Sequence, residues 1–312
     1  MKSLKSFREE FGKALVDIGR GNKDLVVIDA DVCKSTKTEY FARAFPDRFI
    51  QVGISEQDLV GIACGIALAG KIPVASTFAM FLFRAWEQIR NTVARDNLNV
   101  KFVVTHGGLS DYLDGSSHQC LEDIAIMRVI PNMKVVIPAD TLSMKKLLLE
   151  GILEEGPFYM RLGRDYAPVV YHSLEDVTLG KTTILREGDD ICIVACGIMV
   201  SLALRAYEEL KKKGINATVL DFHTIKPFDV KTLVKFAKKV NGFVVAEEHN
   251  IIGGLGSAIA EVLSEQKPKP IRRVGVYDCF GMCSRDYLSL LQYYGLTSES
   301  IIKAAEEILN EI

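Results

Sequence analysis

The sequence has no apolar run long enough to cross a membrane. Its longest strongly apolar stretch without a charge is LVGIACGIALAG, residues 59–70, whereas a spanning helix needs about 20 such residues. The first residues, MKSLKSFREEFGKAL, mix acids and bases at helical spacing and contain no apolar signal core. We therefore expect neither a secretory signal nor a membrane partner.

The sequence also lacks a charge excess and the cysteine spacing of a zinc site. Lys and Arg total 38 and Asp and Glu total 40, for a net charge of -2, which argues against a nucleic-acid partner. Seven cysteines form no Cys-x2-Cys pair, and the two Cys-x3-Cys spacings, at 192–196 and 279–283, have no histidines beside them. We expect no metal site on these thiols, and an odd cysteine number predicts reduced thiols in the cytoplasm.

Short apolar runs alternate with longer helical patterns along the 312 residues. This alternation predicts βαβ units and parallel sheets covered on both faces. Strands are expected at 25–28, 48–52, 73–76, 100–105, 134–137, 157–161, 191–195, 217–221, 243–246 and 271–276. Helices are expected at 4–18, 38–44, 56–69, 81–95, 122–129, 142–153, 200–212, 229–239, 257–265 and 298–309, the last with Ser298 as its N-cap.

The alternation breaks between residues 165 and 190, where proline, glycine and charged residues predict a linker or a small hairpin. The length allows about two domains. The predicted fold class is therefore α/β with two domains, each a mainly parallel sheet flanked by helices. The expected boundaries are residues 1–166 for the first domain, 167–189 for the linker and 190–312 for the second domain.

Polar residues follow the strands of the first domain. Because ligands of open α/β sheets bind outside the carboxyl ends of the strands, acids, imidazoles and a guanidinium at one edge predict an active site. The ordinary polarity of loops would account for part of this pattern. The residues concerned are Asp29, Asp31, Ser35, Ser55, Glu56, His106, Asp111, Asp114, His118 and Arg164.

Four motifs resemble the C-terminal half of transketolase: GISEQDL at 53–59, STFAMF at 76–81, DGSSHQ at 114–119 and IKPFD at 225–229. The resemblance runs from Arg8 to the final helix. It implies that residues 1–166 form the pyrimidine-binding domain and that residues 190–312 form the transketolase C-terminal domain.

The resemblance also implies a partner. A full-length transketolase carries, before these domains, a Gly-Asp-Gly…Asn motif that holds Mg²⁺ and the diphosphate of thiamine diphosphate. The nearest string here, at 188–190, lies in the expected linker. The chain therefore resembles one subunit of a split transketolase, whose N-terminal subunit would hold the Mg²⁺. Gly61 and Gly65 lie on one helix face that the family uses at a subunit interface, and a heterotetramer is the expected assembly.

The resemblance assigns the cofactor-binding residues. Glu56 would hydrogen-bond N1′ of the aminopyrimidine, Phe81 would pack on that ring, and Asp31 would lie near the thiazolium. Phe78 is either a pocket wall or a core residue. From local sequence alone, Glu56 could instead be a first-turn acid that complements the helix dipole, and Asp31 could form a structural Asx-turn.

The loop after residue 106 is expected to contact the reacting sugar. His118 matches the family histidine that moves protons to and from sugar oxygens, and Asp114 matches the acid that contacts the C2 hydroxyl. The loop departs from the usual Gly-Glu-Asp-Gly-Pro-Thr-His pattern at Tyr112, Leu113 and Ser116. These departures predict a different pocket shape around the acceptor sugar.

Four further residues match the sugar-phosphate clamp of the family: Arg8, Ser35, His106 and Arg164. A guanidinium suits this task because its planar fork binds two phosphate oxygens at once. Arg8 could equally form a surface salt bridge on its own helix. A separate glycine-rich turn, residues 253–256, superficially suggests a phosphate loop, but the matching family position is structural.

The resemblance thus predicts transfer of a two-carbon ketol unit from xylulose 5-phosphate to ribose 5-phosphate or glyceraldehyde 3-phosphate, with the partner subunit present. Two related enzymes share the Glu56 motif: a 1-deoxyxylulose-5-phosphate synthase-like protein and the beta subunit of a 2-oxoacid dehydrogenase. A non-catalytic regulatory module of the same fold is the alternative outside the enzymes.

Overall fold

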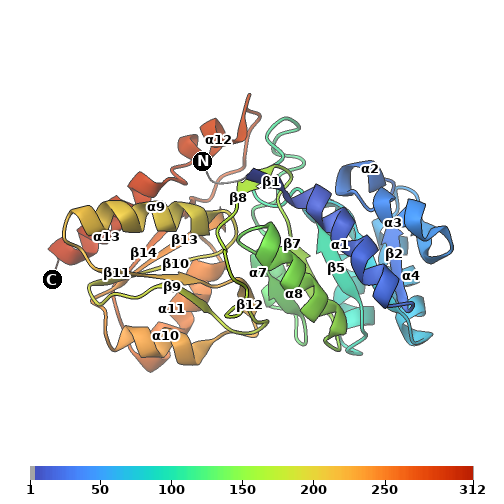
Figure 1. Cartoon of the computed structure of the whole chain (residues 1–312), viewed down its shortest axis with the longest axis horizontal. Helices are drawn as coiled ribbons and strands as arrows, with labels where there is room; N and C mark the ends of the chain where they lie inside the picture. Colours follow the sequence, from blue (N-terminus) through green and yellow to red (C-terminus); the bar gives the residue numbers. More distant parts are fainter. Residues whose placement is uncertain (1–3, 312) are drawn as a thin grey trace.

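Six short runs from the first 161 residues, together with β12 from the second half of the chain, form a seven-stranded sheet in the order β12-β6-β7-β5-β4-β2-β3 (Figure 1). Six strands are parallel, and β12 runs antiparallel to β6. Every residue of β5 and β7 is buried, as expected for a sheet covered on both faces. The strands are β2 (Leu25–Asp29), β3 (Phe49–Gln51), β4 (Ile72–Ser76), β5 (Lys101–Val104), β6 (Lys134–Val136), β7 (Phe158–Arg161) and β12 (Thr224–Lys226).

A second sheet of five strands lies beside the first, in the order β14-β13-β10-β11-β9 (Figure 1). Four of its strands are parallel, and β9 pairs antiparallel with β11. These strands are β9 (Thr183–Arg186), β10 (Ile191–Ala195), β11 (Ala217–Asp221), β13 (Phe243–Asn250) and β14 (Ile271–Val276). A separate antiparallel pair joins β1 (Leu4–Ser6) to β8 (Tyr166–Pro168).

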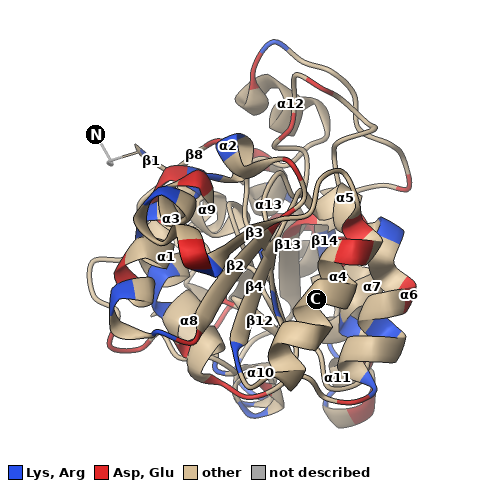
Figure 2. Cartoon of the chain, turned by 90° about the vertical axis from the view of Figure 1, so that its right-hand side faces the viewer, with Lys and Arg blue, Asp and Glu red and all other residues tan. Residues whose placement is uncertain are grey.

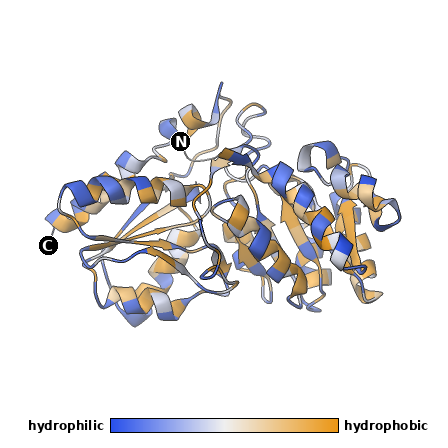
Figure 3. Cartoon of the chain, viewed as in Figure 1, coloured by the Kyte–Doolittle hydropathy of each residue, from blue (hydrophilic) through white to orange (hydrophobic). Residues whose placement is uncertain are grey.

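Helices cover both faces of the sheets, and two apolar cores result, each running through both halves of the chain. In Figure 3 the strands are mostly hydrophobic and the outer faces of the helices are hydrophilic. One core includes α1 (Phe7–Gly21), α8 (Thr141–Leu153), α9 (Met199–Lys212), α12 (Tyr287–Tyr293) and α13 (Ser298–Asn310). The other includes α4 (Glu56–Leu68), α5 (Ala79–Leu82), η3 (Ile89–Ala94), α7 (Asp123–Arg128), α10 (Val230–Ala237) and α11 (Leu255–Gln266).

The remaining helices are short: α2 (Cys33–Thr36), α3 (Glu39–Ala44), η1 (Pro46–Arg48), η2 (Phe83–Ala85) and α6 (Trp86–Gln88). In Figure 2, acidic and basic residues are interspersed over the helices, consistent with the small net charge. These observations confirm the predicted fold class, an α/β protein with mainly parallel sheets flanked by helices.

Several predicted element boundaries were wrong. The first helix starts at Phe7 and not at residue 4, because Ser6 caps it by accepting a hydrogen bond from Glu9 N and the preceding residues pair with β8. The single helix expected at 81–95 is instead α5, η2, α6 and η3, since the backbone leaves helical geometry at Ala85. The last helix is capped by Thr297 and not by Ser298.

The structure, a computed structural model, describes residues 4–311, so residues 1–3 and 312 of the predicted domains lie outside it. The segment 167–189, predicted as a linker, contains β9 and the end of β8. β12, from the second half, adds a strand to the first sheet. Within residues 4–311, no helix combines the length and apolarity required to traverse a bilayer.

Candidate active site

The carboxyl edge of the first sheet holds the candidate residues. Strands β3, β2, β4, β5 and β7 are adjacent and parallel, so the segments that follow them leave the sheet at the same edge. These segments carry Glu56 after β3, Asp31 and Ser35 after β2, Phe78 and Phe81 after β4, His106, Asp114 and His118 after β5, and Arg164 after β7.

Glu56 is the first residue of α4 and is only 6% exposed. Arg84 Nε lies 3.9 Å from its Oε2, but the Arg84 side chain is 77% exposed, so solvent weakens this ion pair. The Glu56 carboxylate is therefore shielded from water and has a weak ion pair with Arg84. Such a group is well suited to exchange a hydrogen bond with a ligand at the sheet edge.

Aromatic rings line the edge next to Glu56. The Phe78 ring stacks on the His106 ring with centroids 3.6 Å apart and on the Phe81 ring with centroids 4.9 Å apart. Phe81 meets His118 edge to face at 5.2 Å. Phe78 is buried between its neighbours, whereas Phe81 and His118 are half-buried. Phe81 is therefore the ring with a face left for a flat ligand.

Arg8 is hydrogen-bonded to two of the other three residues predicted to bind the sugar phosphate. Its Nε donates to the Arg164 carbonyl at 2.7 Å, and its Nη1 donates to the Ser35 carbonyl at 3.0 Å. Arg8 therefore bonds to two other segments of the chain, and within residues 4–311 it does not form the alternative, a salt bridge on the surface of its own helix. Burial and the charge of Arg164 lower the pKa of the Arg8 guanidinium, as expected for two like charges held close together.

His106, the fourth residue predicted to bind the sugar phosphate, is a neutral ring close enough to Arg8 and Arg164 to be affected by their charges. It is buried at a positive φ of 62°, and its Nδ1 lies 2.7 Å from Thr105 Oγ1. Burial and the charges of Arg8 and Arg164 lower the His106 pKa to about 2. At neutral pH the imidazole therefore offers hydrogen bonding without adding a third positive charge.

Asp31 and Asp29 have different environments. The Asp29 carboxylate is buried and accepts hydrogen bonds from Val32 N, Thr36 Oγ1 and Thr38 Oγ1. The structural turn at this position is thus held by Asp29. Asp31 is exposed at a φ of 66°, and its backbone N–H donates to Gln51 Oε1. This leaves the Asp31 side chain available at the edge.

The loop after His106 carries two exposed or half-buried residues of the family motif and a third, Asp111, that the sequence predicted only as one of the polar residues at the sheet edge. Asp114 is exposed, and His118 is half-buried with its Nδ1 2.9 Å from Ser117 Oγ. Asp111 is fully buried, and its Oδ1 lies 3.4 Å from Arg164 Nη1. The only sequence signal for Asp111 was its place in a polar loop, because it lies outside the family motif.

The edge supplies residues for an aromatic ring and for an anion, but no metal centre. Among residues 4–311, no three His, Cys, Asp or Glu side chains lie close enough together to hold a metal ion.

Two family sequence models match the chain. The model described as "Transketolase, pyrimidine binding domain" covers residues 4–169, and "Transketolase, C-terminal domain" covers residues 180–301. The chain belongs to the transketolase family. This confirms the resemblance inferred from the four motifs, and it makes the chain a member of a thiamine diphosphate-dependent family.

Individual relatives support the same assignment. The chain is 46% identical over 308 residues to the "Putative transketolase C-terminal section" of Methanocaldococcus jannaschii, covering 97% of this chain and 96% of that protein. It is 41% identical over 303 residues to the 6-deoxy-6-sulfo-D-fructose transketolase subunit SqwH of Clostridium sp. (strain MSTE9), covering 96% and 94%. A solved structure described as "Split gene transketolase, inactive beta4 tetramer" is 46% identical, with a TM-score of 0.89 and 98% of each chain covered.

In this transketolase-family chain, a buried ion-pair network ties the second sheet to the candidate site. Arg161, the last residue of β7, donates from Nη1 to Asp123 Oδ1 at 3.1 Å and from Nη2 to the Glu248 carbonyl at 3.0 Å. Glu248 Oε1 accepts from Leu109 N at 2.8 Å and from the Tyr287 hydroxyl at 2.6 Å. A residue of β13 thus fixes the start of the loop that carries Asp114.

A second contact supports the far part of the same loop. Gln119 Nε2 donates to the Met282 carbonyl at 3.0 Å, and Ser284 N donates to the Tyr112 carbonyl at 2.8 Å. Gly115, at a φ of 78°, lies against Cys283 so closely that an added Cβ would come within 2.5 Å of the sulfur. The C-terminal half of this transketolase-family chain therefore shapes the loop from its outer side.

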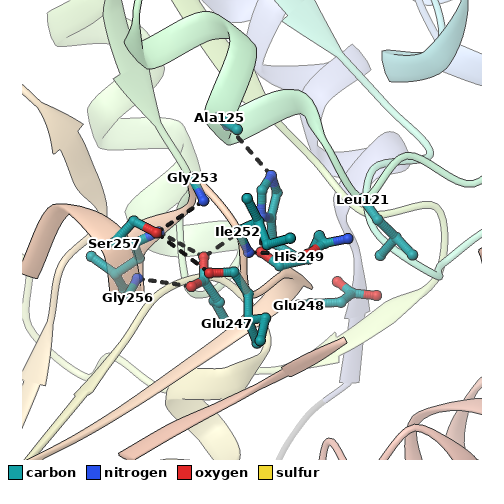
Figure 4. A network of polar contacts seen from close by, with 12 residues as sticks. Leu121, Ala125, Glu247, Glu248, His249, Ile252, Gly253, Gly256 and Ser257 are labelled. Atoms are coloured by element: carbon teal, nitrogen blue, oxygen red, sulfur yellow. Dashed lines mark hydrogen bonds and ion pairs between the residues drawn. The ribbon is translucent and has the colours of Figure 1, made fainter. Parts of the chain in front are cut away.

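The glycine-rich turn at 253–256 has a structural role. Glu247 accepts hydrogen bonds from Leu255 N at 2.7 Å and from Gly256 N at 2.8 Å (Figure 4). These are the N–H groups that a phosphate would otherwise use at the start of α11. The family-based expectation for this turn agrees with the contact, because a protein carboxylate already occupies the helix N-terminus.

Proposed function

We propose that this chain is the C-terminal subunit of a thiamine diphosphate-dependent transketolase. The reaction moves a two-carbon ketol unit from a ketose phosphate such as xylulose 5-phosphate to an aldose phosphate such as ribose 5-phosphate or glyceraldehyde 3-phosphate. The observation that carries this proposal is the buried carboxylate of Glu56 on the same sheet edge as the arginine clamp. The buried acid suits a cofactor ring, and the clamp suits the charged end of a sugar.

Each side chain then has a role in the proposal. When bound, thiamine diphosphate supplies the carbon that carries the two-carbon unit. Glu56 would hydrogen-bond N1′ of the aminopyrimidine and share its proton. Phe81, which stacks on Phe78, would pack on that ring, and Asp31 would lie near the thiazolium.

The remaining residues act on the sugar. His118 moves protons to and from sugar oxygens as a general acid and base, and Asp114 accepts a hydrogen bond from the C2 hydroxyl. Arg8, Ser35, His106 and Arg164 hold the terminal anion. Hydrogen bonds that already join Arg8 to Ser35 and Arg164 support this assignment, because a preorganised clamp loses less entropy on binding.

The proposal includes a partner that carries the diphosphate and Mg²⁺. No cluster suited to a metal is found within residues 4–311, and a solved relative is described as an inactive tetramer of beta chains. Gly61 and Gly65 on α4 are exposed, with no atom within 4 Å of an added Cβ, so a second chain can approach closely there. We propose a heterotetramer of two N-terminal and two C-terminal subunits, located in the cytoplasm.

The domain division belongs to the same proposal. Residues 1–166 would form the pyrimidine-binding domain and residues 190–312 the C-terminal domain, joined by 167–189. The matched family ranges, 4–169 and 180–301, support a division near these positions.

Reconstitution tests the proposal. The purified chain is mixed with an N-terminal transketolase subunit, Mg²⁺ and thiamine diphosphate, and transfer from xylulose 5-phosphate to ribose 5-phosphate is measured. We expect transfer by the mixture and none by either chain alone. Full activity of the isolated chain would refute the split-subunit proposal. Use of pyruvate in place of the ketose would instead indicate a deoxyxylulose-phosphate synthase-like enzyme or a 2-oxoacid dehydrogenase, and an unchanged rate in Glu56→Ala would indicate a non-catalytic role.

A further inference from the structure

Tyr112 lies beside the guanidinium of Arg164, a residue predicted to bind the sugar phosphate. The Cζ atom of Arg164 lies over the Tyr112 ring, 5.5 Å from the ring centroid. A guanidinium within about 6 Å of the centroid of an aromatic ring is attracted by the negative charge of the ring face. The Arg164 side chain is 23% exposed, so solvent screens this contact only in part. The Tyr112 ring therefore stabilises one position of the Arg164 guanidinium.

Arg164 needs this support because a second cation lies close to it. Burial and the charge of Arg164 lower the pKa of Arg8, so the two guanidinium groups repel each other. Asp111 Oδ1 lies 3.4 Å from Arg164 Nη1, but neither oxygen of Asp111 has a hydrogen-bond partner within residues 4–311. The attractive contacts of the Arg164 guanidinium in this part of the chain are therefore a long ion pair and the Tyr112 ring.

The C-terminal half of the chain holds Tyr112 in turn. Ser284 N donates to the Tyr112 carbonyl at 2.8 Å. The Tyr287 ring stacks beside the Tyr112 ring, with centroids 6.4 Å apart and an angle of 19° between the planes. Tyr287 is buried, and its hydroxyl donates to Glu248 Oε1 at 2.6 Å. Tyr112 is thus held at both its backbone and its ring, and it offers Arg164 a fixed surface.

The sequence marks Tyr112 as a departure from the usual loop pattern, which has glycine at this position. A glycine has no side chain to contact Arg164, so a loop of the usual pattern cannot make this contact. The departure was expected to alter the pocket around the acceptor sugar. The contact with Arg164 indicates instead an effect on the residues that would hold the phosphate.

We propose that Tyr112 is a positioning residue for phosphate binding, whose ring holds the Arg164 guanidinium in place against repulsion by Arg8. The inference rests on the proposed function, because that function supplies the sugar phosphate. Tyr112 acts through Arg164 and not through a contact of its own with the sugar. Its loss therefore weakens the binding of a phosphorylated sugar and leaves the chemical step unchanged.

The experiment measures ketol transfer by the reconstituted complex at saturating ribose 5-phosphate. The donor is either xylulose 5-phosphate or erythrulose, a ketose without a phosphate. In Tyr112→Leu, we expect the KM for xylulose 5-phosphate to rise by about two- to fivefold, the range that a partly exposed contact between a cation and a ring provides. The kcat and the KM for erythrulose should not change. Tyr112→Phe keeps the ring and should restore the KM for xylulose 5-phosphate.

Two comparisons separate this effect from a general loss of loop structure. Adding Tyr112→Leu to Arg164→Ala should cause no further rise in the KM for xylulose 5-phosphate, because one residue acts through the other and their effects do not add. Tyr207→Leu is the matched control, since Arg186 Cζ lies 5.5 Å from the Tyr207 ring centroid, on β9 and α9 of the second domain. This control removes a contact of the same length and should change neither KM.

The outcomes separate this inference from the proposed function. An unchanged KM for xylulose 5-phosphate in Tyr112→Leu would overturn the inference and leave the transketolase function standing. An equal rise in the KM of both donors, or a further rise in the double variant, would also overturn it. Absence of transfer from any ketose by the wild-type complex would overturn both. Where Tyr112→Leu does not fold, Tyr112→Gly, with the residue of the usual loop pattern, provides the same comparison.

Discussion

Removal of Arg161 should destabilise the chain more than removal of any surface arginine. Its guanidinium is buried between Asp123, 3.1 Å away, and Glu248, 3.3 Å away. Arg161→Met keeps an aliphatic side chain against Gly107. It removes the cation that pairs with the two buried carboxylates. Breaking a buried ion pair in this way costs about 3–5 kcal/mol. At roughly 2 °C per kcal/mol, the thermal midpoint should fall by about 6–10 °C.

The loss of stability caused by Arg161→Met should be larger at neutral pH than at acidic pH. Burial raises the pKa of Glu248 above its ordinary value, and Arg161 opposes that rise. A carboxyl whose folded-state pKa is raised stabilises the fold when protonated, and this contribution is lost as the pH rises through that pKa. Without Arg161 the Glu248 pKa rises further. The penalty of Arg161→Met should therefore be largest near pH 7 and become smaller toward about pH 5.

Thermal denaturation of the purified chain, followed by circular dichroism at several pH values, measures this loss. Arg20→Met is the matched control, because Arg20 pairs with Asp17 on the surface and both side chains are 69% exposed. This control should change the stability by less than about 0.5 kcal/mol. Adding Glu248→Gln to Arg161→Met should recover part of the loss. A midpoint equal to that of the control, or a loss independent of pH, would refute the argument.

Three further predictions concern the site and its support. Glu56→Gln should lower ketol transfer by the reconstituted complex by at least about 100-fold. The thermal midpoint should stay within about 1 °C of the wild-type value. Retention of half the wild-type rate would contradict the role of Glu56. Arg164→Lys should raise the KM for a phosphorylated donor by about 10-fold or more, because a lysine cannot bind two phosphate oxygens with a planar fork. The KM for a ketose without an anionic end should stay the same. Equal changes for both donors would contradict a role of Arg164 in binding the phosphate. Glu247→Gln should lower the free energy of unfolding by about 1 kcal/mol, because the negative charge at the start of α11 is lost. The kcat of the complex should not change. A lower kcat with unchanged stability would show that Glu247 does more than cap the helix.

The parallel strands were predictable because each is a short apolar run, as at β2 and β10, and both faces of such strands are buried. The placement of β12 in the first sheet was not predictable, since the sequence 224–226 does not indicate which sheet it joins. The helix boundaries at Ser6 and Ala85 depend on capping and on local backbone geometry, which apolar periodicity does not report.

The candidate site was predictable where a motif marks it, as at Glu56, Phe81 and His118, and these assignments stay predictions. Residues defined only by tertiary contacts were missed. Arg161 and Glu248 come from strands whose apolar pattern hides them, and they meet only because the two sheets pack together. Asp111 was predicted only as one of several polar loop residues, and its ion pair with Arg164 became visible only in the fold.

The contact between Glu56 and the cofactor can be measured in a structure of the assembled complex with bound thiamine diphosphate and Mg²⁺. We expect the Glu56 carboxylate within about 3.2 Å of N1′ of the aminopyrimidine, with the Phe81 ring against the aminopyrimidine and the diphosphate held by the other chain. An aminopyrimidine out of reach of Glu56, or a diphosphate bound entirely by this chain, would contradict the account.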